Sequence, residues 1–309
     1  MIYTVTLNPA LDKTVEIPNF TLGNVNRITS LRTDPGGKGI NVSKVIAKLG
    51  GSSMALGILG GNTGRAIADG LNQLGLNCSF LSAEGETRTN LKVIDPVNHT
   101  NTDINEPGFE ITEALLDSLL QHLVQMVKPG DIVVLSGSLP KGASKDTYGK
   151  WVTRCKDAGA KVFLDADGDP LVEGLKANPY LVKPNNDELS RLMGRELAGI
   201  EDLVCAAKKL LAAGIEKVVV SMGGKGALYV TKEATVHAEG LKVPVGSTVG
   251  AGDSVVAALA VAEDKGMTLE EAVVLSTATG AANVMCSGTQ AAEWETIEAL
   301  MPKVIYHTL

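Results

Sequence analysis

A glycine-rich turn followed by an aspartate is the stretch of this sequence best suited to chemistry. Residues 247–254 read Ser-Thr-Val-Gly-Ala-Gly-Asp-Ser, and the apolar run after them predicts a helix. The first N–H groups of a helix lack partners and lie at the positive end of its dipole, so they can bind an anion. A transferring phosphoryl group would fit an anion hole formed by Gly250, Ala251 and Gly252. Asp253 could accept the proton of a hydroxyl group, although a carboxylate that only caps the helix explains it equally well.

Two further turns carry groups suited to a polar ligand. Residues 35–43 read Pro-Gly-Gly-Lys-Gly-Ile-Asn-Val-Ser. Close approach of a ligand to the backbone is possible at Gly37, Lys38 adds a charge, and Asn41 offers a donor and an acceptor. Asp12 closes the first predicted strand, where its carboxylate could bind paired sugar hydroxyls or simply stabilise a turn.

The sequence Lys-Pro-Asn-Asn-Asp-Glu at 183–188 allows two interpretations. Asn185 and Glu188 have the spacing of a helix capping box. Glu188 could instead orient a hydrated Mg²⁺ ion near phosphates. The segment Ser-Met-Gly-Gly-Lys-Gly at 221–226 likewise fits either a tight hairpin or a loop that lines a nucleotide. Arg88, in 86–90, could bind a phosphate through its planar fork.

Two known phosphate-binding patterns are not met. Both Gly-Lys pairs, at 37–38 and 224–225, are followed by glycine, which excludes a P-loop. The turn at 250–255 lacks the third glycine of the dinucleotide fingerprint, and Glu270 and Glu271 begin a predicted helix rather than end a strand. An oxidoreductase is therefore disfavoured.

The elements that must position these motifs alternate between short β-branched runs and helical segments, which predicts a parallel sheet covered by helices on both faces. The predicted strands are 2–7, 55–59, 132–135, 162–165, 181–182, 218–221 and 227–230, and the predicted helices include 39–48, 63–73, 111–126 and 144–157. In such sheets ligands bind at the carboxyl ends of the strands, where the glycine motifs fall. Segments 13–33 and 86–107 alternate polar and apolar residues and predict a small accessory sheet that acts as a lid. The simplest organisation is one domain, 1–309, with this lid.

Composition excludes several classes of partner. The 309 residues carry a net charge of −7, which disfavours nucleic acid and anionic membranes. The N-terminus does not resemble a signal peptide, and no apolar run is long enough to cross a membrane. The four cysteines are scattered without metal-binding spacing, so we expect a cytoplasmic protein.

The combination of motifs resembles the PfkB (ribokinase-like) family of carbohydrate kinases over essentially the whole chain. The stretches GGKGINVS and STVGAGDS resemble the two signatures of that family, and LNPALD, SGSLP, KPNNDE and SMGGKGA occur in the same order. The resemblance implies an α/β fold with three α/β/α layers, a mostly parallel sheet and a small β-sheet lid. It also implies ATP as co-substrate with Mg²⁺, and it makes a monovalent cation a further candidate.

The resemblance also implies roles for individual residues. Asp253 would be the base, with Gly250, Ala251 and Gly252 as the anion hole. The sugar phosphate would contact Asp12, Gly37, Lys38, Asn41, Arg88 and Ser138, with Lys38 and Arg88 on its existing phosphate and Arg27 as a further candidate. The nucleotide would contact Lys183, Asn185, Ser221, Gly223, Gly226, Thr248 and Asn283, and Glu188 would hold Mg²⁺ through water.

Within the family, TVTLNPALD, Lys38, ETRTN and TDINEPGFE most resemble kinases that convert fructose 1-phosphate to fructose 1,6-bisphosphate. Kinases of tagatose 6-phosphate and of fructose 6-phosphate are the alternatives. A non-catalytic sensor of sugar phosphates or nucleotides is a hypothesis of another class, which an intact Asp253 beside an intact anion hole disfavours. The resemblance also predicts a homodimer formed through the lid.

Overall fold

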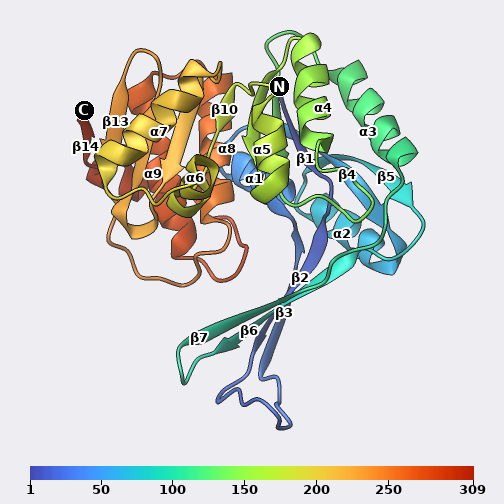
Figure 1. Ribbon diagram of the computed structural model, residues 1–309. Coiled ribbons are helices and arrows are strands. Elements are labelled where there is room, and N and C mark those ends of the chain that lie inside the picture. The colour runs from blue at the N-terminus through green and yellow to red at the C-terminus, as the bar shows by residue number, and fades with distance from the viewer.

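The computed structural model describes residues 1–309 and contains one large and one small sheet (Figure 1). The large sheet has ten strands in the order β14-β13-β12-β11-β10-β9-β8-β1-β4-β5. In chain order these strands are β1 Ile2–Thr6, β4 Ser53–Gly60, β5 Asn77–Ala83, β8 Ile132–Ser136, β9 Lys161–Asp165, β10 Leu181–Val182, β11 Lys217–Ser221, β12 Ala227–Val230, β13 Thr235–Ala238 and β14 Tyr306–Thr308.

Seven neighbouring strands, from β5 to β11, run parallel, and β12, β13 and β14 extend the sheet antiparallel at one edge. The central strands are buried along their whole length, as expected for β-branched runs that pack on both faces. Because their carboxyl ends share one edge, the loops that follow β1, β8, β9 and β11 lie side by side.

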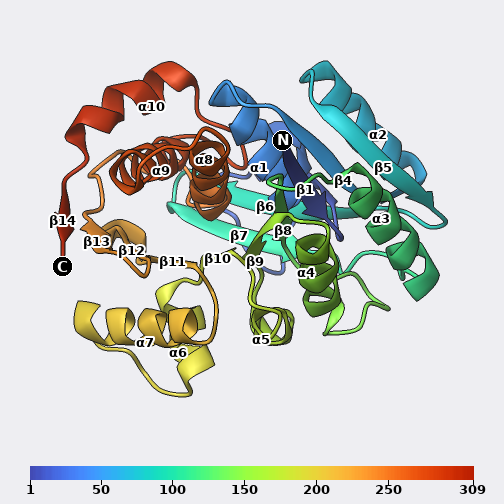
Figure 2. The same ribbon diagram turned by 90° about the horizontal axis from the view of Figure 1, so that it is seen from above.

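Helices cover both faces of the large sheet (Figure 2). One apolar core joins the sheet to α3, α4, α5, α6 and α7, and a second core joins the other face to α1, α8, α9 and α10. Helix α2 packs beside α1 in a smaller cluster. The helices are α1 Lys38–Lys48, α2 Gly61–Gln73, α3 Glu113–Met126, α4 Thr147–Asp157, α5 Gly168–Leu175, α6 Asn186–Met193, α7 Ile200–Ala212, α8 Ala251–Asp264, α9 Leu269–Val284 and α10 Trp294–Leu300.

The small sheet projects from the main body (Figure 1). It has the order β3-β2-β6-β7, with β2 Ala10–Glu16, β3 Ser30–Gly36, β6 Arg88–Asp95 and β7 Thr100–Asn105. Strands β2 and β6 pair in parallel, and the other two pairings are antiparallel. One face of this sheet looks onto the loops at the carboxyl edge of the large sheet.

The predicted fold is confirmed, including its three layers, its mostly parallel sheet and the separate small sheet. The pattern analysis missed the edge strands β5 and β14 and the short strand β13 beside β14, whose polar residues weaken the alternation. It placed the first small-sheet strand at residue 13, three residues later than Ala10, where β2 begins. No helix is both long and apolar enough to span a membrane.

Candidate active site

A cavity of about 950 Å³ lies where the loops after β1, β8, β9 and β11 meet the small sheet and the start of α8. Most of the residues singled out in the sequence line it, although they come from positions up to 241 residues apart, from 12 to 253. They are Asp12, Gly37, Lys38, Asn41, Arg88, Ser138, Lys183, Asn185, Glu188, Ser221, Gly250, Gly252 and Asp253. The parallel topology gathers them because each motif follows the carboxyl end of a strand.

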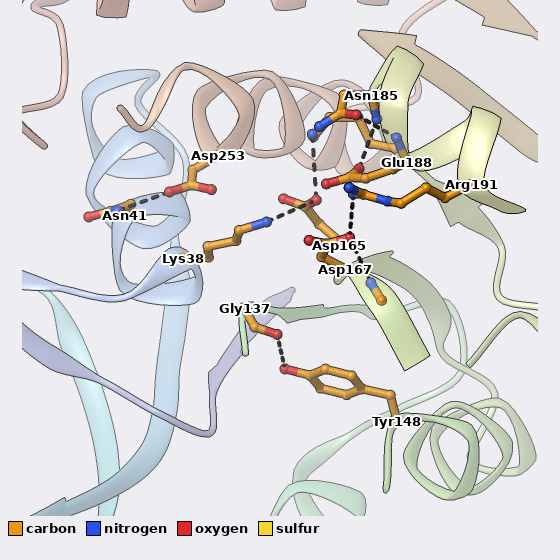
Figure 3. Close-up of polar contacts among 12 residues, drawn as sticks. Lys38, Asn41, Gly137, Tyr148, Asp165, Asp167, Asn185, Glu188, Arg191 and Asp253 are labelled. Atoms are coloured by element: carbon orange, nitrogen blue, oxygen red, sulfur yellow. Dashed lines mark hydrogen bonds and ion pairs between the residues drawn. The ribbon is translucent and has the colours of Figure 1, made fainter. Parts of the chain in front are cut away.

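Asp253 lies in the first turn of α8, with its carboxylate directed into the cavity (Figure 3). Its side chain is 6% exposed and accepts a hydrogen bond of 2.9 Å from Asn41 Nδ2. Burial raises the pKa of this carboxyl above its ordinary value. The carboxylate does not cap α8, whose N-cap is Gly250, so the capping interpretation has no support in the geometry.

Two glycines leave the helix start open to a ligand. Gly250 has a φ of 82°, a left-handed conformation that favours glycine. A Cβ atom at Gly252 would lie 3.1 Å from Lys183 Nζ. Gly250 and Gly252 thus line the cavity beside an ammonium group, at a helix start of the kind that binds anions.

Asp165, which the motif analysis did not identify, lies at the centre of the polar groups in Figure 3. It ends β9, is 3% exposed, and its Oδ1 atom lies 3.4 Å from Lys38 Nζ and 3.5 Å from Lys183 Nζ. Burial alone would raise its pKa, but the two ammonium groups outweigh burial and lower it. Its Oδ2 atom is buried without a hydrogen-bond partner. The sequence signal that could have identified Asp165 is a carboxylate at the end of a predicted central strand.

Lys38 lies between acidic groups, with its ammonium group directed toward Asp165 (Figure 3). Asp165 is the largest cause of its raised pKa, and Asp253 adds to the effect. The pKa values of the two aspartates are thus displaced in opposite directions: Asp165 is held as an anion, whereas Asp253 binds a proton more readily. Such divergence is typical of sites where one carboxylate acts as a base and another as a fixed charge.

The helix at 186–193 begins with the predicted capping box. Asn185 Oδ1 accepts a hydrogen bond of 2.7 Å from the N–H of Glu188, and Glu188 Oε2 accepts one of 2.8 Å from the N–H of Asn185. This leaves Glu188 Oε1 without a protein hydrogen bond in a side chain that lines the cavity. The structural role is confirmed, and one carboxylate oxygen remains for a ligand.

The small sheet contributes a second polar end to the cavity. Asp12 Oδ1 accepts a hydrogen bond of 3.0 Å from Asn90 Nδ2, and burial raises the pKa of Asp12. The Oδ1 atoms of Asn41 and Asn90 are buried without partners, so each can accept a hydrogen bond from a ligand hydroxyl. Asn90 lies in the segment predicted to form the small sheet, but in the stretch 86–90 only Arg88 was given a role.

Arg88 is less free than the sequence suggested. Its Nη2 atom donates to the carbonyl of Asn8 at 2.9 Å, Nη1 to that of Glu106 at 3.1 Å, and Nε to that of Pro9 at 3.4 Å. The guanidinium group thus joins the small sheet to the loop after β1. One N–H on each of Nη1 and Nη2 remains free to donate a hydrogen bond to a ligand. Ser138 lies nearby, bonded to Asn8 Nδ2 at 3.3 Å.

Several predicted ligands do not line this cavity. Asn283 is buried behind the turn that precedes α8, where its Nδ2 atom donates to the carbonyl of Val249 at 3.2 Å, so it supports the turn from below. Gly226 closes the β11–β12 hairpin beside the Ala238 carbonyl, with no room for a Cβ atom. The others outside the lining are Ala251, Thr248, Gly223 and, at the exposed tip of the small sheet, Arg27.

Transfer of a phosphoryl group to an alcohol requires an anion site beside a base, with room for a hydroxylated acceptor at one end and a nucleotide at the other. The fold and the cavity together define a small-molecule kinase of this kind. The family model for pfkB family carbohydrate kinases matches residues 5–297, and the chain belongs to this family.

Relatives and solved structures agree with this assignment. The chain is 40% identical to the 1-phosphofructokinase of Bacillus subtilis (strain 168), covering 98% of both chains. It is 36% identical to the 1-phosphofructokinase of Escherichia coli (strain K12), covering 97% of this chain and 96% of the other. The crystal structure of Escherichia coli phosphofructokinase-2 in complex with substrates and products superposes with a TM-score of 0.94 at 34% identity, covering 98% of both chains. The same enzyme is also known in complex with potassium and as a tetrameric inhibited form.

Proposed function

We propose that this protein transfers the γ-phosphoryl group of ATP to fructose 1-phosphate and forms fructose 1,6-bisphosphate. The observation that carries the proposal is the buried Asp253 carboxylate at the open start of α8, hydrogen-bonded to Asn41. The names of the relatives support fructose 1-phosphate as the acceptor.

The transfer step follows from the groups around Asp253. The acceptor hydroxyl oxygen attacks the γ-phosphorus, the bond from that phosphorus to the β,γ-bridging oxygen breaks, and ADP leaves. Asp253 takes the hydroxyl proton, and the N–H groups at Gly250, Ala251 and Gly252 stabilise the charge on the transferring oxygens. We assign Lys38 to this transferring group rather than to the existing phosphate, because it lies beside Asp165 and Asp253.

The sugar would lie over Asp12 and the small sheet. The Asp12 carboxylate and the unpartnered oxygens of Asn41 and Asn90 fit its hydroxyl groups, and Gly37 lines the same end of the cavity. With Lys38 assigned to transfer, Arg88 and Ser138 are the groups for the existing phosphate. Each would add one contact to those it already makes.

The nucleotide would enter beside β10, β11 and the start of α6. Lys183 and Asn185 suit its phosphates, and Ser221 lines the same end of the cavity. Gly223, Gly226 and Thr248 would border the nucleotide from outside the described lining, and Asn283 would support that border.

The oxygen-rich side chains of this region fit Mg²⁺. Glu188 has one free carboxylate oxygen and Asp165 has a buried oxygen without a partner, and both are hard ligands that Mg²⁺ accepts directly or through water. The ion would neutralise phosphate charge. A monovalent cation is a further proposed cofactor, supported by the potassium complex of phosphofructokinase-2.

We further propose that the small sheet acts as the lid of a single kinase domain spanning 1–309, and that its outer face joins two copies of the chain. Leu31 and Ile104 point outward from β3 and β7 and are 59% and 53% exposed. The adjoining loop exposes Leu22, Val25 and Ile28. Exposed apolar side chains gathered on one part of a protein often mark an interaction surface. The four free cysteines support a reducing cytoplasm as the compartment of this protein.

A coupled assay of ADP release tests the function. Fructose 1-phosphate, fructose 6-phosphate, tagatose 6-phosphate and fructose would be compared with MgATP at matched concentrations. We expect the highest kcat/KM for fructose 1-phosphate. A higher value for another sugar phosphate would refute the substrate assignment, and tight binding without any ADP release would favour a sensor.

A further inference from the structure

The cavity-facing side of the small sheet carries two rows of side chains that cross all four strands. The register aligns Asp34, Asp12, Asn90 and Asn105 in one row. It aligns Arg32, Thr14, Lys92 and Asp103 in the next row, one step further from the main body. The first row contains the proposed sugar ligands. The second row carries two cations to which the proposed function gives no role.

Lys92 contacts the loop that leads into α8. Its Nζ atom donates to Ser247 Oγ at 3.3 Å, and its side chain is only 12% exposed. Ser247 Oγ also accepts a hydrogen bond of 3.2 Å from the N–H of Val249. Lys92 therefore acts on a side chain that shapes the turn immediately before Gly250, where the anion hole begins. Its one acidic neighbour on the sheet, Asp103, is 3.9 Å away, too far for a strong hydrogen bond.

Arg32 contacts a second loop of the C-terminal half, the one that follows α9. Its Nη2 atom donates to the carbonyl of Ser287 at 2.8 Å, while Nε bonds Asp34 at 2.7 Å. The next residue, Gly288, has a φ of 63°, and a Cβ atom there would collide with the Arg32 guanidinium group and lie 3.1 Å from Thr14 Oγ1. The absence of a side chain at Gly288 lets the second row approach this loop.

Lys44 holds the same loop at a second point. Its buried ammonium group donates to the carbonyl of Thr289 at 3.1 Å and to that of Pro35, at the end of β3, at 2.9 Å. The loop after α9 is thus held to a strand of the small sheet at two successive points. The contacts of Arg32 and Lys92 are the polar bridges from the sugar-binding sheet to the two loops beside the start of α8.

We propose that Lys92 and Arg32 are positioning residues that make sugar and nucleotide binding cooperative. Sugar bound over Asp12 holds the small sheet in place, and the two bridges then hold the loops that shape the anion hole. Nucleotide phosphates bound at that hole hold the same loops and, through Ser247, the small sheet. The proposal rests on the proposed kinase function, because it needs one ligand on the sheet and another at α8. By linkage, each ligand must raise the affinity of the other by the same factor.

Calorimetry on the full-length protein tests the proposal. The Kd of the non-hydrolysable β,γ-imido analogue of ATP, with Mg²⁺, would be measured with and without saturating fructose 1-phosphate. For the unmodified protein we expect tighter binding by a factor of about 5 or more, the lower end of usual coupling between sites. In Lys92→Met, which keeps the apolar stem, this factor should fall to below about 2, while the Kd of each ligand alone stays nearly constant. Lys232→Met, an exposed lysine without an ion pair, is the matched control.

A double-mutant cycle identifies the partner. If Lys92 acts through Ser247, then Ser247→Ala should reduce the coupling factor, and the double variant should lose no more than Lys92→Met alone. Additive losses would overturn the proposal, because Lys92 would then act independently of Ser247. Weaker binding of fructose 1-phosphate alone, in Lys92→Met only, would also overturn it and would make Lys92 a direct phosphate ligand. Absence of coupling in the unmodified protein would also overturn it. That result leaves the kinase function standing, because turnover of fructose 1-phosphate is measured separately. An unchanged melting temperature of Lys92→Met excludes a general loss of structure.

Discussion

Replacing Asp253 with asparagine removes the proposed base and changes little else. The side chain keeps its size, and its amide oxygen can still accept the hydrogen bond that Asn41 donates to Asp253 at 2.9 Å. Loss of a positioned base lowers a rate by a factor of about 10²–10⁴, which corresponds to roughly 3–5 kcal/mol in the barrier. We expect kcat to fall by that factor while the Kd of ATP changes little.

The stability of the same variant should move in the opposite direction. Burial raises the pKa of Asp253, so the ionised form is disfavoured in the folded protein relative to the unfolded chain. Above the folded pKa this carboxylate therefore costs stability, and a neutral asparagine removes that cost. The melting temperature at pH 7 should equal or exceed that of the unmodified protein.

Three measurements on Asp253→Asn decide the matter: kcat from coupled ADP release, the Kd of the imido analogue, and the melting temperature. Asp117→Asn, an exposed aspartate on α3 without a partner, is the control and should match the unmodified protein. In the unmodified protein kcat/KM should decline on the acidic side around a pKa above the ordinary value of about 3.9, and this limb should vanish in the variant. A variant that melts early but keeps its specific activity would refute the assignment of Asp253 as base.

Three further predictions concern the metal, the existing phosphate and the tip of the small sheet. Glu188→Gln keeps the capping-box bond to Asn185 but weakens the charge near the metal, so half-maximal activity should need more Mg²⁺ at an unchanged melting temperature; an unchanged Mg²⁺ titration would leave Glu188 a purely structural role. Arg88→Ala should raise the KM for fructose 1-phosphate by a factor of about ten or more, from roughly 1.5–3 kcal/mol for a charged hydrogen bond. It should affect ATP and unphosphorylated fructose far less, and equal losses for all three would mean that Arg88 only joins the small sheet to the loop after β1. Burial of Asp95 would raise its pKa, but hydrogen bonds from Asn98, Val97 and Asn19 outweigh burial and lower it. Asp95→Ala should therefore lower the melting temperature at pH 6, and its difference from the unmodified protein should shrink as the pH falls below about 4; a difference independent of pH would contradict this.

The local sequence was sufficient to predict the turns and helix starts that form the site. Glycine conformations at residues such as Gly250, the capping box of Asn185 and Glu188, and the alternation of strands and helices depend on neighbouring residues in the chain. Short-range sterics and hydrogen bonds determine these features, so a single sequence reveals them. The rule that ligands bind at the carboxyl ends of parallel strands then placed most of the predicted residues at one cavity.

The tertiary structure alone decided how the charged groups are paired. Asp165 ends an ordinary strand, and only the folded chain places it between Lys38, at the start of α1, and Lys183, which follows β10. In the same way, Arg88 meets carbonyl groups about 80 residues earlier in the chain, and Lys92 meets Ser247, 155 residues later. Such partners leave no periodic signal because their separation along the chain is arbitrary. Hydrogen bonding and desolvation, which set the pKa values of Asp253 and Asp165, therefore arise only when the folded chain brings these groups together.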